Sequence, residues 1–357
     1  MKLALIMSDE VGLRTQFLNW KNNFPKDLGI EPHFIMISFR KPNGWIEQLP
    51  GLPEFVKTRI RAAIEIREGL REGPFDATFI AVHSVLSLVP GYSSKHPCFT
   101  TLDVTPKQLH SFGGYYGKYP SKVAAIELFK HRSRKNNYNS YRGLFPWSNW
   151  AANSLIEDYG VSVNKITVVP PGVDTNTWKP SEIRTFGKIS NLLFVGGDFE
   201  RKGGVLLLDW AKRTKLENWR LDIVTRQEIK TNDPRIKIHN NLQSNDPVLA
   251  DLYRNASIFV LPTLADCYSI AGIEALASGL PVILSLTGGT GDVVQDGRTG
   301  YLLTTPSFEE LEKKLQNLTS DSNLRLSMAT AARADALERY DVVKNIHKIV
   351  SIMFQSI

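Results

Sequence analysis

Residues 257–303, SIFVLPTLADCYSIAGIEALASGLPVILSLTGGTGDVVQDGRTGYLL, decide how the rest of the chain is interpreted. The short apolar, β-rich run at 258–261 predicts a buried strand, and the run at 281–286 predicts a second one. Between them, Ser269 is placed to cap a helix over residues 270–278. The order of strand, loop, helix and strand is typical of a parallel α/β sheet.

Two carboxylates lie on either side of the N-terminus of the predicted helix, with seven residues between them: Asp266 on the preceding loop and Glu274 in the second turn. The unpaired amides and the positive dipole end of the helix N-terminus favour a phosphate between them. Gly288 and Gly289 follow the second strand and, lacking Cβ atoms, allow backbone amides to approach a ligand. This arrangement suits a nucleotide-sugar, which carries hydroxyl groups on both sides of a diphosphate. The alternative is a solvated aspartate and a glutamate on the helix surface.

The stretch resembles the donor-binding core of the retaining glycosyltransferases of family 4, the group 1 transferases, which have the GT-B fold. Their signature is a Glu, seven residues and a second Glu, with Phe-Gly after the first Glu and a later Gly-Gly. Glu274 stands at the second acid, which the resemblance implies binds the donor ribose. Asp266, one methylene shorter, stands where the first Glu contacts hydroxyls of the donor sugar, and Tyr268-Ser269 replaces Phe-Gly. The resemblance also assigns donor binding to Ser269, Ile270, Gly288 and Gly289.

A second glycine-rich loop, GGDFERKGG at residues 196–204, follows a predicted strand and precedes a predicted helix. It lacks the G-x-G-x-x-G order of a dinucleotide-binding loop. It is similar to the family loop in which an Arg and a Lys hold the donor diphosphate, and Arg201 and Lys202 match those two catalytic positions. Gly196 and Gly197 belong to the same donor-binding loop, although many family members have an Arg where Gly197 stands. The alternative is a charged surface loop.

Strand and helix patterns alternate through the whole chain, which predicts doubly wound parallel sheets. The predicted helices include 54–72, 144–159 with Ser148 as its cap, 308–318 and 324–340. The predicted strands lie at 2–8, 33–39, 77–82, 98–102, 165–169, 192–195, 221–225 and 235–239, in addition to the two already described.

The resemblance implies α/β GT-B architecture, with two Rossmann-like parallel-sheet domains facing each other across a cleft. Residues 171–188, which begin with a Pro-Gly-Val-Asp run, are the predicted linker. The linker separates an N-terminal acceptor-binding domain, 1–170, from a C-terminal nucleotide-sugar donor-binding domain, 189–340. A last helix, about residues 341–357, is expected to pack back on the first domain.

Polar residues in the first half stand where parallel strands end, which is where such sheets bind ligands. Asp103 follows the strand at 98–102, at a position where many family members have a histidine, and we assign it a catalytic role. A carboxylate capping a turn is the alternative. Gly12 and Arg14 follow the first strand, where the family carries a loop that faces the acceptor and the donor phosphates.

The positive charge of the chain lies entirely in its first half. Residues 1–170 hold 21 Lys or Arg against 14 Asp or Glu, and residues 171–357 hold 22 against 22. Residues 118–142 alone hold seven cations and one acid, with apolar residues at helical spacing, a pattern that suits a helix on an anionic bilayer. The alternative is a solvated basic helix. The expected membrane-contact residues are Lys130, Arg132, Arg134 and Lys135.

These features predict a glycosyltransferase that moves a sugar from a nucleoside-diphosphate sugar to a hydroxyl acceptor. The resemblance implies a retaining, metal-independent hexosyltransferase without a cofactor, for which we expect a lipid-linked or saccharide acceptor in glycolipid or cell-envelope polysaccharide synthesis. No nucleic-acid-binding motif is present. The first residues hold too short an apolar run for a signal peptide, so we expect a cytoplasmic protein that associates peripherally with the inner face of the membrane.

Two alternatives to a glycosyltransferase stay open at this point. One is a nucleotide-sugar 2-epimerase of the same fold. The other is a catalytically silent sugar- or partner-binding protein, because Asp103, Asp266 and Ser269 all depart from the family pattern.

Overall fold

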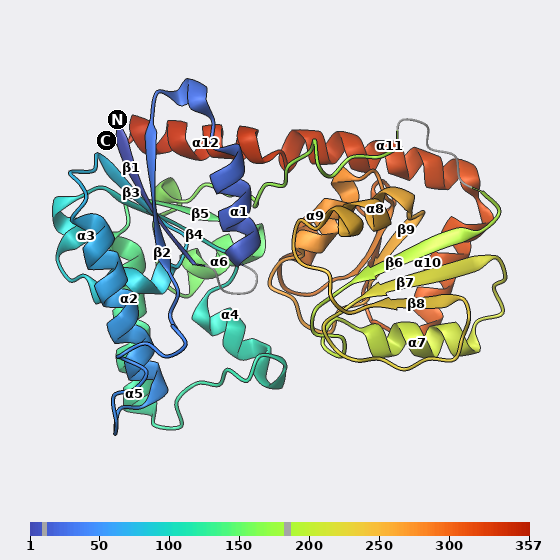
Figure 1. Ribbon diagram of the computed structural model, residues 1–357, viewed down its shortest axis with the longest axis horizontal. Coiled ribbons are helices and arrows are strands. Elements are labelled where there is room, and N and C mark those ends of the chain that lie inside the picture. The colour runs from blue at the N-terminus through green and yellow to red at the C-terminus, as the bar shows by residue number, and fades with distance from the viewer. Residues whose placement is uncertain (9–12, 182–186) are drawn as a thin grey trace. The chain divides into compact units, whose positions relative to one another are not determined.

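The computed structural model describes residues 1–8, 13–181 and 187–357, and it divides the chain into two compact units (Figure 1). The first unit comprises Met1–His110, Tyr119–Gly172 and Val342–Ile357. The second unit comprises Ser111–Lys118 and Val173–Asp341. Each unit is built around one parallel sheet.

The sheet of the first unit has the strand order β2-β1-β3-β4-β5, and every neighbouring pair is parallel. Along β1, Leu3, Leu5 and Met7 enter one apolar cluster, whereas Ala4 and Ile6 enter another. This alternation places a core on each face, as expected for a sheet covered by helices on both sides. The strands are β1 (Lys2–Ser8), β2 (Glu31–Ile37), β3 (Ala77–Ile80), β4 (Cys98–Leu102) and β5 (Gly143–Pro146).

One of the covering helices comes from the far end of the chain. Ile346, Ile349 and Met353 of α12 are buried in the same cluster as Leu3 and Leu5, so the last helix belongs to the first unit. The helices of this part of the chain are α1 (Leu13–Asn23), α2 (Glu54–Leu70), α3 (Tyr92–Lys95), α4 (Pro106–Ser111), α5 (Ala124–Ser140), α6 (Asn149–Glu157) and α12 (Val342–Gln355).

The sheet of the second unit has the strand order β11-β10-β9-β6-β7-β8, also parallel throughout. Its strands are β6 (Ser190–Val195), β7 (Trp219–Val224), β8 (Ile236–His239), β9 (Ile258–Leu261), β10 (Val282–Ser285) and β11 (Gly300–Leu303). Its helices are α7 (Gly204–Arg213), α8 (Pro247–Asn255), α9 (Ile270–Ala277), α10 (Phe308–Ser320) and α11 (Ser322–Arg339). The strand order reverses between β6 and β9, and the loops that follow those two strands therefore diverge from a common point.

Two sequence predictions in the first unit are wrong. The stretch 144–159 is not one helix, because Gly143–Pro146 forms strand β5 and α6 begins only at Asn149. Residues 165–169 do not form a regular strand, but they run beside β5: Ile166 bridges Leu144, and the Thr167 and Val169 amides donate to the Leu144 and Pro146 carbonyls, each at 3.0 Å. A 3-10 turn (Val163–Lys165) precedes this segment and Pro170 follows it. The predicted cap is confirmed, since the Ser148 hydroxyl accepts a hydrogen bond from the Ala151 amide at 3.1 Å.

Part of the stretch interpreted as a linker packs into the second unit. The Val173 amide donates to the Tyr340 carbonyl at 2.8 Å. The Trp178 ring is fully buried and meets the Tyr253 ring edge-on, with ring centroids 5.0 Å apart. Arg333 donates to the Trp178 carbonyl at 2.9 Å.

Replacing Ser148 with alanine should lower the free energy of unfolding of the first unit by about 1 kcal/mol, because the cap of α6 is lost. Urea denaturation followed by circular dichroism measures the change. Ser162→Ala is the matched control, since Ser162 precedes a 3-10 turn without making a side-chain capping bond, and this variant should unfold like the parent. Equal effects of the two substitutions would contradict the capping interpretation.

Candidate functional site

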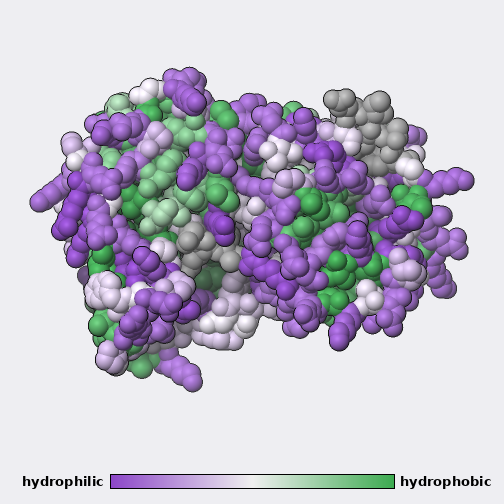
Figure 2. All heavy atoms as spheres, in the orientation of Figure 1, coloured by the Kyte–Doolittle hydropathy of each residue, from purple (hydrophilic) through white to green (hydrophobic). Residues whose placement is uncertain are grey.

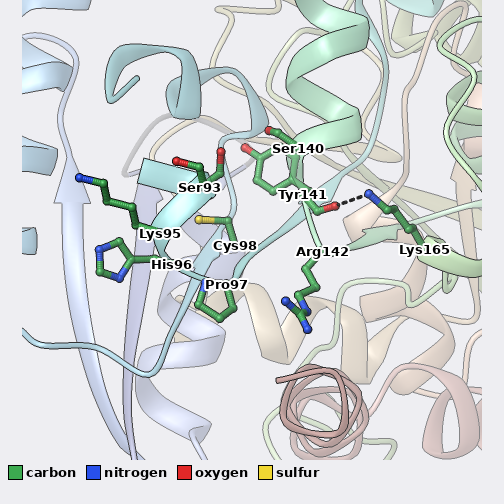
Figure 3. A pocket seen from close by; sticks show the side chains of 10 residues that line it. Ser93, Lys95, His96, Pro97, Cys98, Ser140, Tyr141, Arg142 and Lys165 are labelled. Atoms are coloured by element: carbon green, nitrogen blue, oxygen red, sulfur yellow. Dashed lines mark hydrogen bonds between the residues drawn. The ribbon is translucent and has the colours of Figure 1, made fainter. Parts of the chain in front are cut away.

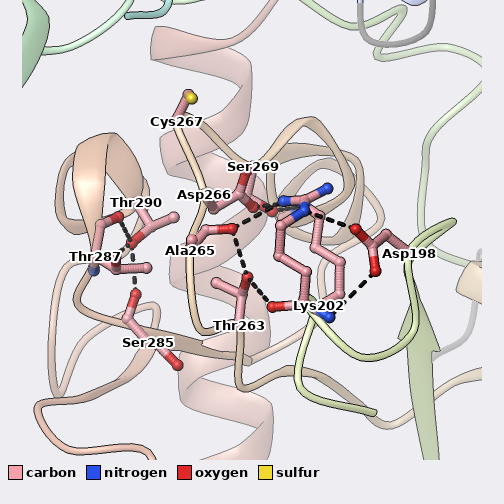
Figure 4. A network of polar contacts seen from close by, with 12 residues as sticks. Asp198, Lys202, Thr263, Ala265, Asp266, Cys267, Ser269, Ser285, Thr287 and Thr290 are labelled. Atoms are coloured by element: carbon pink, nitrogen blue, oxygen red, sulfur yellow. Dashed lines mark hydrogen bonds and ion pairs between the residues drawn. The ribbon is translucent and has the colours of Figure 1, made fainter. Parts of the chain in front are cut away.

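The reversal of strand order between β6 and β9 places two chemically distinct loops side by side in the second unit (Figure 4). The loop after β6 carries Arg201 and Lys202, and the loop after β9 carries Asp266. The Leu264 amide donates to the Arg201 carbonyl at 2.8 Å, so the main chains of the two loops are tied together. Ligands of doubly wound sheets bind at such a switch point.

Arg201 is held from several directions. Its Nε donates to Asp198 Oδ2 at 2.9 Å, and its Nη1 donates to the Ala265 carbonyl at 2.8 Å and to the Tyr116 hydroxyl at 3.1 Å. The guanidinium also lies over the Tyr116 ring, 4.6 Å from the ring centroid. The position of this cation is therefore fixed by the protein.

Lys202 and Asp266 form an ion pair, with 2.5 Å between Lys202 Nζ and Asp266 Oδ2. The two side chains are 17% and 5% exposed, so both charges are largely withdrawn from water. Gly196 allows this approach, because a Cβ atom there would lie 2.9 Å from Lys202 Cβ. The structure thus brings together two residues that the sequence assigned to the same site from loops far apart in the chain.

The helix after Asp266 begins as predicted. The Ser269 hydroxyl accepts a hydrogen bond from the Gly272 amide at 3.1 Å, which confirms Ser269 as the N-cap of α9. Ile270 is the first residue of α9 and is partly buried. The first-turn amides of a helix have no partner within it, so this end can bind an anion.

Glu274 does not lie on a solvated helix surface. It is only 6% exposed, and the Tyr253 hydroxyl donates to its Oε2 at 3.1 Å. Burial raises the pKa of Glu274 to about 8, although the bond from Tyr253 acts in the opposite direction. Near neutral pH the group is therefore largely a neutral carboxylic acid, which can both donate and accept hydrogen bonds.

The third loop of the site contains the two predicted glycines. Gly288 has a φ of +55°, and a Cβ atom there would lie 2.1 Å from the Asp266 carbonyl oxygen. The Gly289 amide donates to the Cys267 carbonyl at 3.0 Å. Glycine is required at position 288 because the loop passes directly over the main chain of the acidic loop.

Three residues at this site were not predicted from the sequence: Tyr116, Tyr253 and Arg226. A Cβ atom on Gly197 would lie 3.6 Å from Cδ and Nε of Arg226, so the Arg226 side chain lies beside Gly197. Tyr253 was not predicted as a site residue because its sequence pattern is that of an ordinary buried residue in a helix, here α8. Tyr116 belongs to an aromatic and glycine-rich stretch, FGGYYG, and this unusual composition was the feature of the sequence that could have marked it as a site residue.

The remaining predicted residues belong to the first unit. Asp103 directly follows β4 and is partly buried, whereas Arg14 is exposed in the first turn of α1. Gly12 lies outside the described residues. Lys130, Arg132 and Lys135 are exposed on α5, and Arg134 Nη1 donates to Glu127 at 3.1 Å.

A cavity of about 480 Å³ also lies in the first unit (Figure 3). Cys98 and Arg142, which line it, stand at the amino ends of β4 and β5. Lys165 Nζ, at its rim, donates to the Tyr141 carbonyl at 3.1 Å. Because ligands of parallel sheets bind at the carboxyl ends, this cavity is not part of the candidate site.

Among the residues that the structure describes, no three His, Cys, Asp or Glu side chains gather as metal ligands would. Within the same residues, no helix combines the length and the apolar character needed to span a membrane.

Comparison with known proteins agrees with this geometry. The chain is 30% identical over 207 residues to the MMP alpha-(1->4)-mannosyltransferase of Mycolicibacterium hassiacum. The aligned region covers 55% of this chain and 49% of that protein. The chain thus spans about half the length of the curated relatives it matches.

Solved structures match over nearly the full length. Sucrose-phosphate synthase from Thermosynechococcus elongatus superposes with a TM-score of 0.77 at 14% identity, covering 99% of this chain and 98% of that one. HepE of Anabaena, solved in complex with UDP and glucose, gives a TM-score of 0.68 at 16% identity and covers 99% and 98%. These similarities establish the fold: two parallel α/β sheets of the GT-B type.

Residues 180–335 match the family described as glycosyl transferases group 1, and this range includes every residue of the second-unit loops described above. On that match, this part of the chain, residues 180–335, belongs to the group 1 glycosyltransferase family.

Proposed function

We propose that the protein transfers a sugar from a nucleoside-diphosphate sugar to a hydroxyl acceptor. The observation that supports this most directly is the meeting of Arg201, Lys202 and Asp266 at the switch point of the second sheet. Two fixed cations beside a helix N-terminus suit a diphosphate, and a carboxylate next to them suits the hydroxyl groups of the attached sugar.

Arg201 and Lys202 have the catalytic role in this proposal. When the sugar leaves, negative charge grows on the departing diphosphate, and preorganised cations stabilise that charge more than they stabilise the bound donor. Because Lys202 Nζ is bonded to Asp266, a phosphate oxygen that approaches Lys202 competes with the carboxylate. Asp266 would then accept hydrogen bonds from the donor sugar.

The other donor contacts are proposed from their positions around this centre. Glu274 would bind the ribose hydroxyls, and Gly288 and Gly289 would offer main-chain groups beside Asp266. The nucleotide base would bind to the remaining loops of the second unit. We propose a hexose as the transferred sugar, with retention at its anomeric carbon, on the strength of the family.

The first unit is proposed to bind the acceptor through Asp103, which follows β4, and Arg14, in the first turn of α1. Gly12, outside the described residues, is assigned to this role from the sequence alone. The charge of the first unit favours an anionic surface nearby. On α5 and its N-cap, Val123, Ile126 and Phe129 are 54%, 47% and 74% exposed at three-residue spacing, with Lys122 and Lys130 beside them. Figure 2 shows apolar groups interleaved with hydrophilic ones at lower left, where Figure 1 places α5.

Cations beside exposed apolar side chains are the chemistry of a helix that docks on an anionic bilayer. We therefore propose peripheral attachment to the cytoplasmic face of a membrane. A lipid-linked acceptor for glycolipid or envelope polysaccharide synthesis would be within reach there.

Arg201→Ala and Lys202→Ala should each lower the turnover of the preferred nucleotide-sugar on the order of a hundredfold, as loss of a preorganised charge does in other enzymes. The donor is first identified with UDP-, GDP- and ADP-sugars by thermal shift and by product analysis. Arg220→Ala, an exposed arginine on β7, is the control and should keep parental activity. Isomerised donor without transfer would instead identify an epimerase, and binding without any turnover a silent sugar-binding protein.

Glu274→Gln should make thermal stability less dependent on pH. The pKa of Glu274 rises from 4.5 to about 8 on folding, so its stabilising contribution is complete below pH 4.5 and is lost as pH rises through 8. The melting temperature of the parent should therefore fall relative to that of the variant between pH 5 and pH 9, by several degrees. Glu217→Gln, which changes an exposed acid, should track the parent. A pH-independent difference between Glu274→Gln and parent would contradict a raised pKa.

Phosphatidylglycerol vesicles should co-sediment with the protein at low salt and release it at high salt, because the attraction is screened. Each cation near an anionic surface contributes about 1 kcal/mol, so replacing Lys130, Arg132, Arg134 and Lys135 together should abolish binding. The control replaces four exposed lysines of the second unit, Lys212, Lys215, Lys230 and Lys237, and should still bind. Equal loss in both variants would indicate unspecific charge, and no binding by the parent would refute docking.

A further inference from the structure

The short segment Ser111–Lys118 belongs to the second unit, although the chain on both sides of it belongs to the first. Its sequence, SFGGYYGK, combines three aromatic rings with glycines. The chain therefore leaves the first unit, packs against the donor loops and returns within eight residues. The contacts of Tyr116 explain why this segment packs in the second unit.

Tyr116 contacts two of the three donor loops. Its hydroxyl oxygen accepts a hydrogen bond from Arg201 Nη1 at 3.1 Å, and its ring lies under the Arg201 guanidinium at 4.6 Å. The Cys267 thiol, next to Asp266, donates to the same hydroxyl at 3.6 Å. Tyr116 thus contacts the loop that carries Arg201 through both its ring and its hydroxyl group. It contacts the loop that carries Asp266 through its hydroxyl group alone.

Phe112 extends the segment to the third loop. Its ring centroid lies 5.6 Å from that of Tyr116, and a Cβ atom on Gly288 would lie 3.0 Å from its Cζ. The segment consequently packs against the loops after β6, β9 and β10 together. The rings of Phe112 and Tyr116 therefore lie against the loops that carry the proposed donor residues.

The guanidinium nitrogens of Arg201 make hydrogen bonds with different partners. Asp198 takes Nε, and the Ala265 carbonyl and Tyr116 share Nη1. Burial raises the pKa of Tyr116 far above its ordinary value, so the phenol is neutral and accepts from the arginine without cancelling its charge. A neutral acceptor and an aromatic face orient a guanidinium while leaving its positive charge available to a diphosphate.

We propose that Tyr116 is a positioning residue for Arg201, which it holds in the orientation that meets the donor diphosphate. The inference rests on the proposed function, because it requires Arg201 to contact that diphosphate. A mobile arginine would have to be ordered during the reaction, whereas a fixed one stabilises the leaving group without reorganisation. Tyr116 acts in this way although it lies outside the part of the chain that matches the family.

The test is a double-mutant cycle between Tyr116 and Arg201, read as kcat, KM and binding of UDP and GDP. Tyr116→Phe keeps the ring and loses the acceptor oxygen, so it should lower kcat roughly threefold to tenfold, as loss of one hydrogen bond does. Tyr116→Leu loses the ring as well and should lower kcat further. Both should change kcat more than KM, because positioning acts in the transition state. Adding Tyr116→Leu to Arg201→Ala should cost nothing more.

Tyr115, which is half exposed and adjacent in sequence, provides matched controls. Tyr115→Phe and Tyr115→Leu should leave kcat unchanged, and circular dichroism should show all variants folded. If Arg201→Ala is crippled but Tyr116→Leu matches the parent, or if the two losses multiply in the double variant, Tyr116 does not act through Arg201 and the inference is overturned. If Arg201→Ala itself keeps full activity, the role of Arg201 in the proposed function fails instead, and the inference with it.

Discussion

The parallel pairing of β6 with β9 is the constraint on which the donor site depends. Leu192 pairs with Ile258 and Leu193 with Phe259, and from this junction the remaining strands add outward in both directions. A shift of one residue in this register would turn every side chain to the opposite face of the sheet. It would also break the bond between Leu264 and Arg201 that ties the acidic loop to the cationic one. The chemistry of the site is therefore set by strand order before any single side chain is considered.

Two buried carboxylates at this junction are stabilised in different ways. Asp266 faces Lys202, and an opposite charge at hydrogen-bond distance offsets the cost of removing both from water. Glu274 meets the phenol of Tyr253, and burial raises its pKa to about 8. Lys202 and Asp266 thus both stay charged at the place where the proposed function puts the donor diphosphate. Glu274, a largely neutral acid that can donate as well as accept, lies within α9, and the ribose hydroxyls that it would bind in the proposed function also both donate and accept.

Local chemistry made much of this predictable from the sequence. Ser148 and Ser269 cap their helices because short polar side chains satisfy first-turn amides, and the apolar run Ile258–Leu261 has the composition of a buried strand. The strand Gly143–Pro146 was missed because four residues carry too little periodicity to be distinguished from a helix start. Tyr116, Tyr253 and Arg226 were missed for another reason: tertiary packing alone brings them to the site. The family resemblance assigned Lys202 and Asp266 to one site, but their ion pair across 64 positions was not predicted.

The departures from the family pattern differ in what they change. Tyr268 replaces a Phe and is buried, and burial raises its pKa well above the ordinary value, so it acts as a neutral aromatic core residue. Ser269 replaces a Gly and caps α9 with its hydroxyl, which preserves the helix N-terminus that would face a phosphate in the proposed function. Asp266 is the departure that shortens a side chain: it has one methylene fewer than the Glu of the family, so its carboxylate lies closer to its own main chain. There it meets Lys202, beneath a loop that must carry glycine at 288 to clear the Asp266 carbonyl. The cap of α9 is thus kept, and the change falls on the residue that would contact the donor sugar in the proposed function.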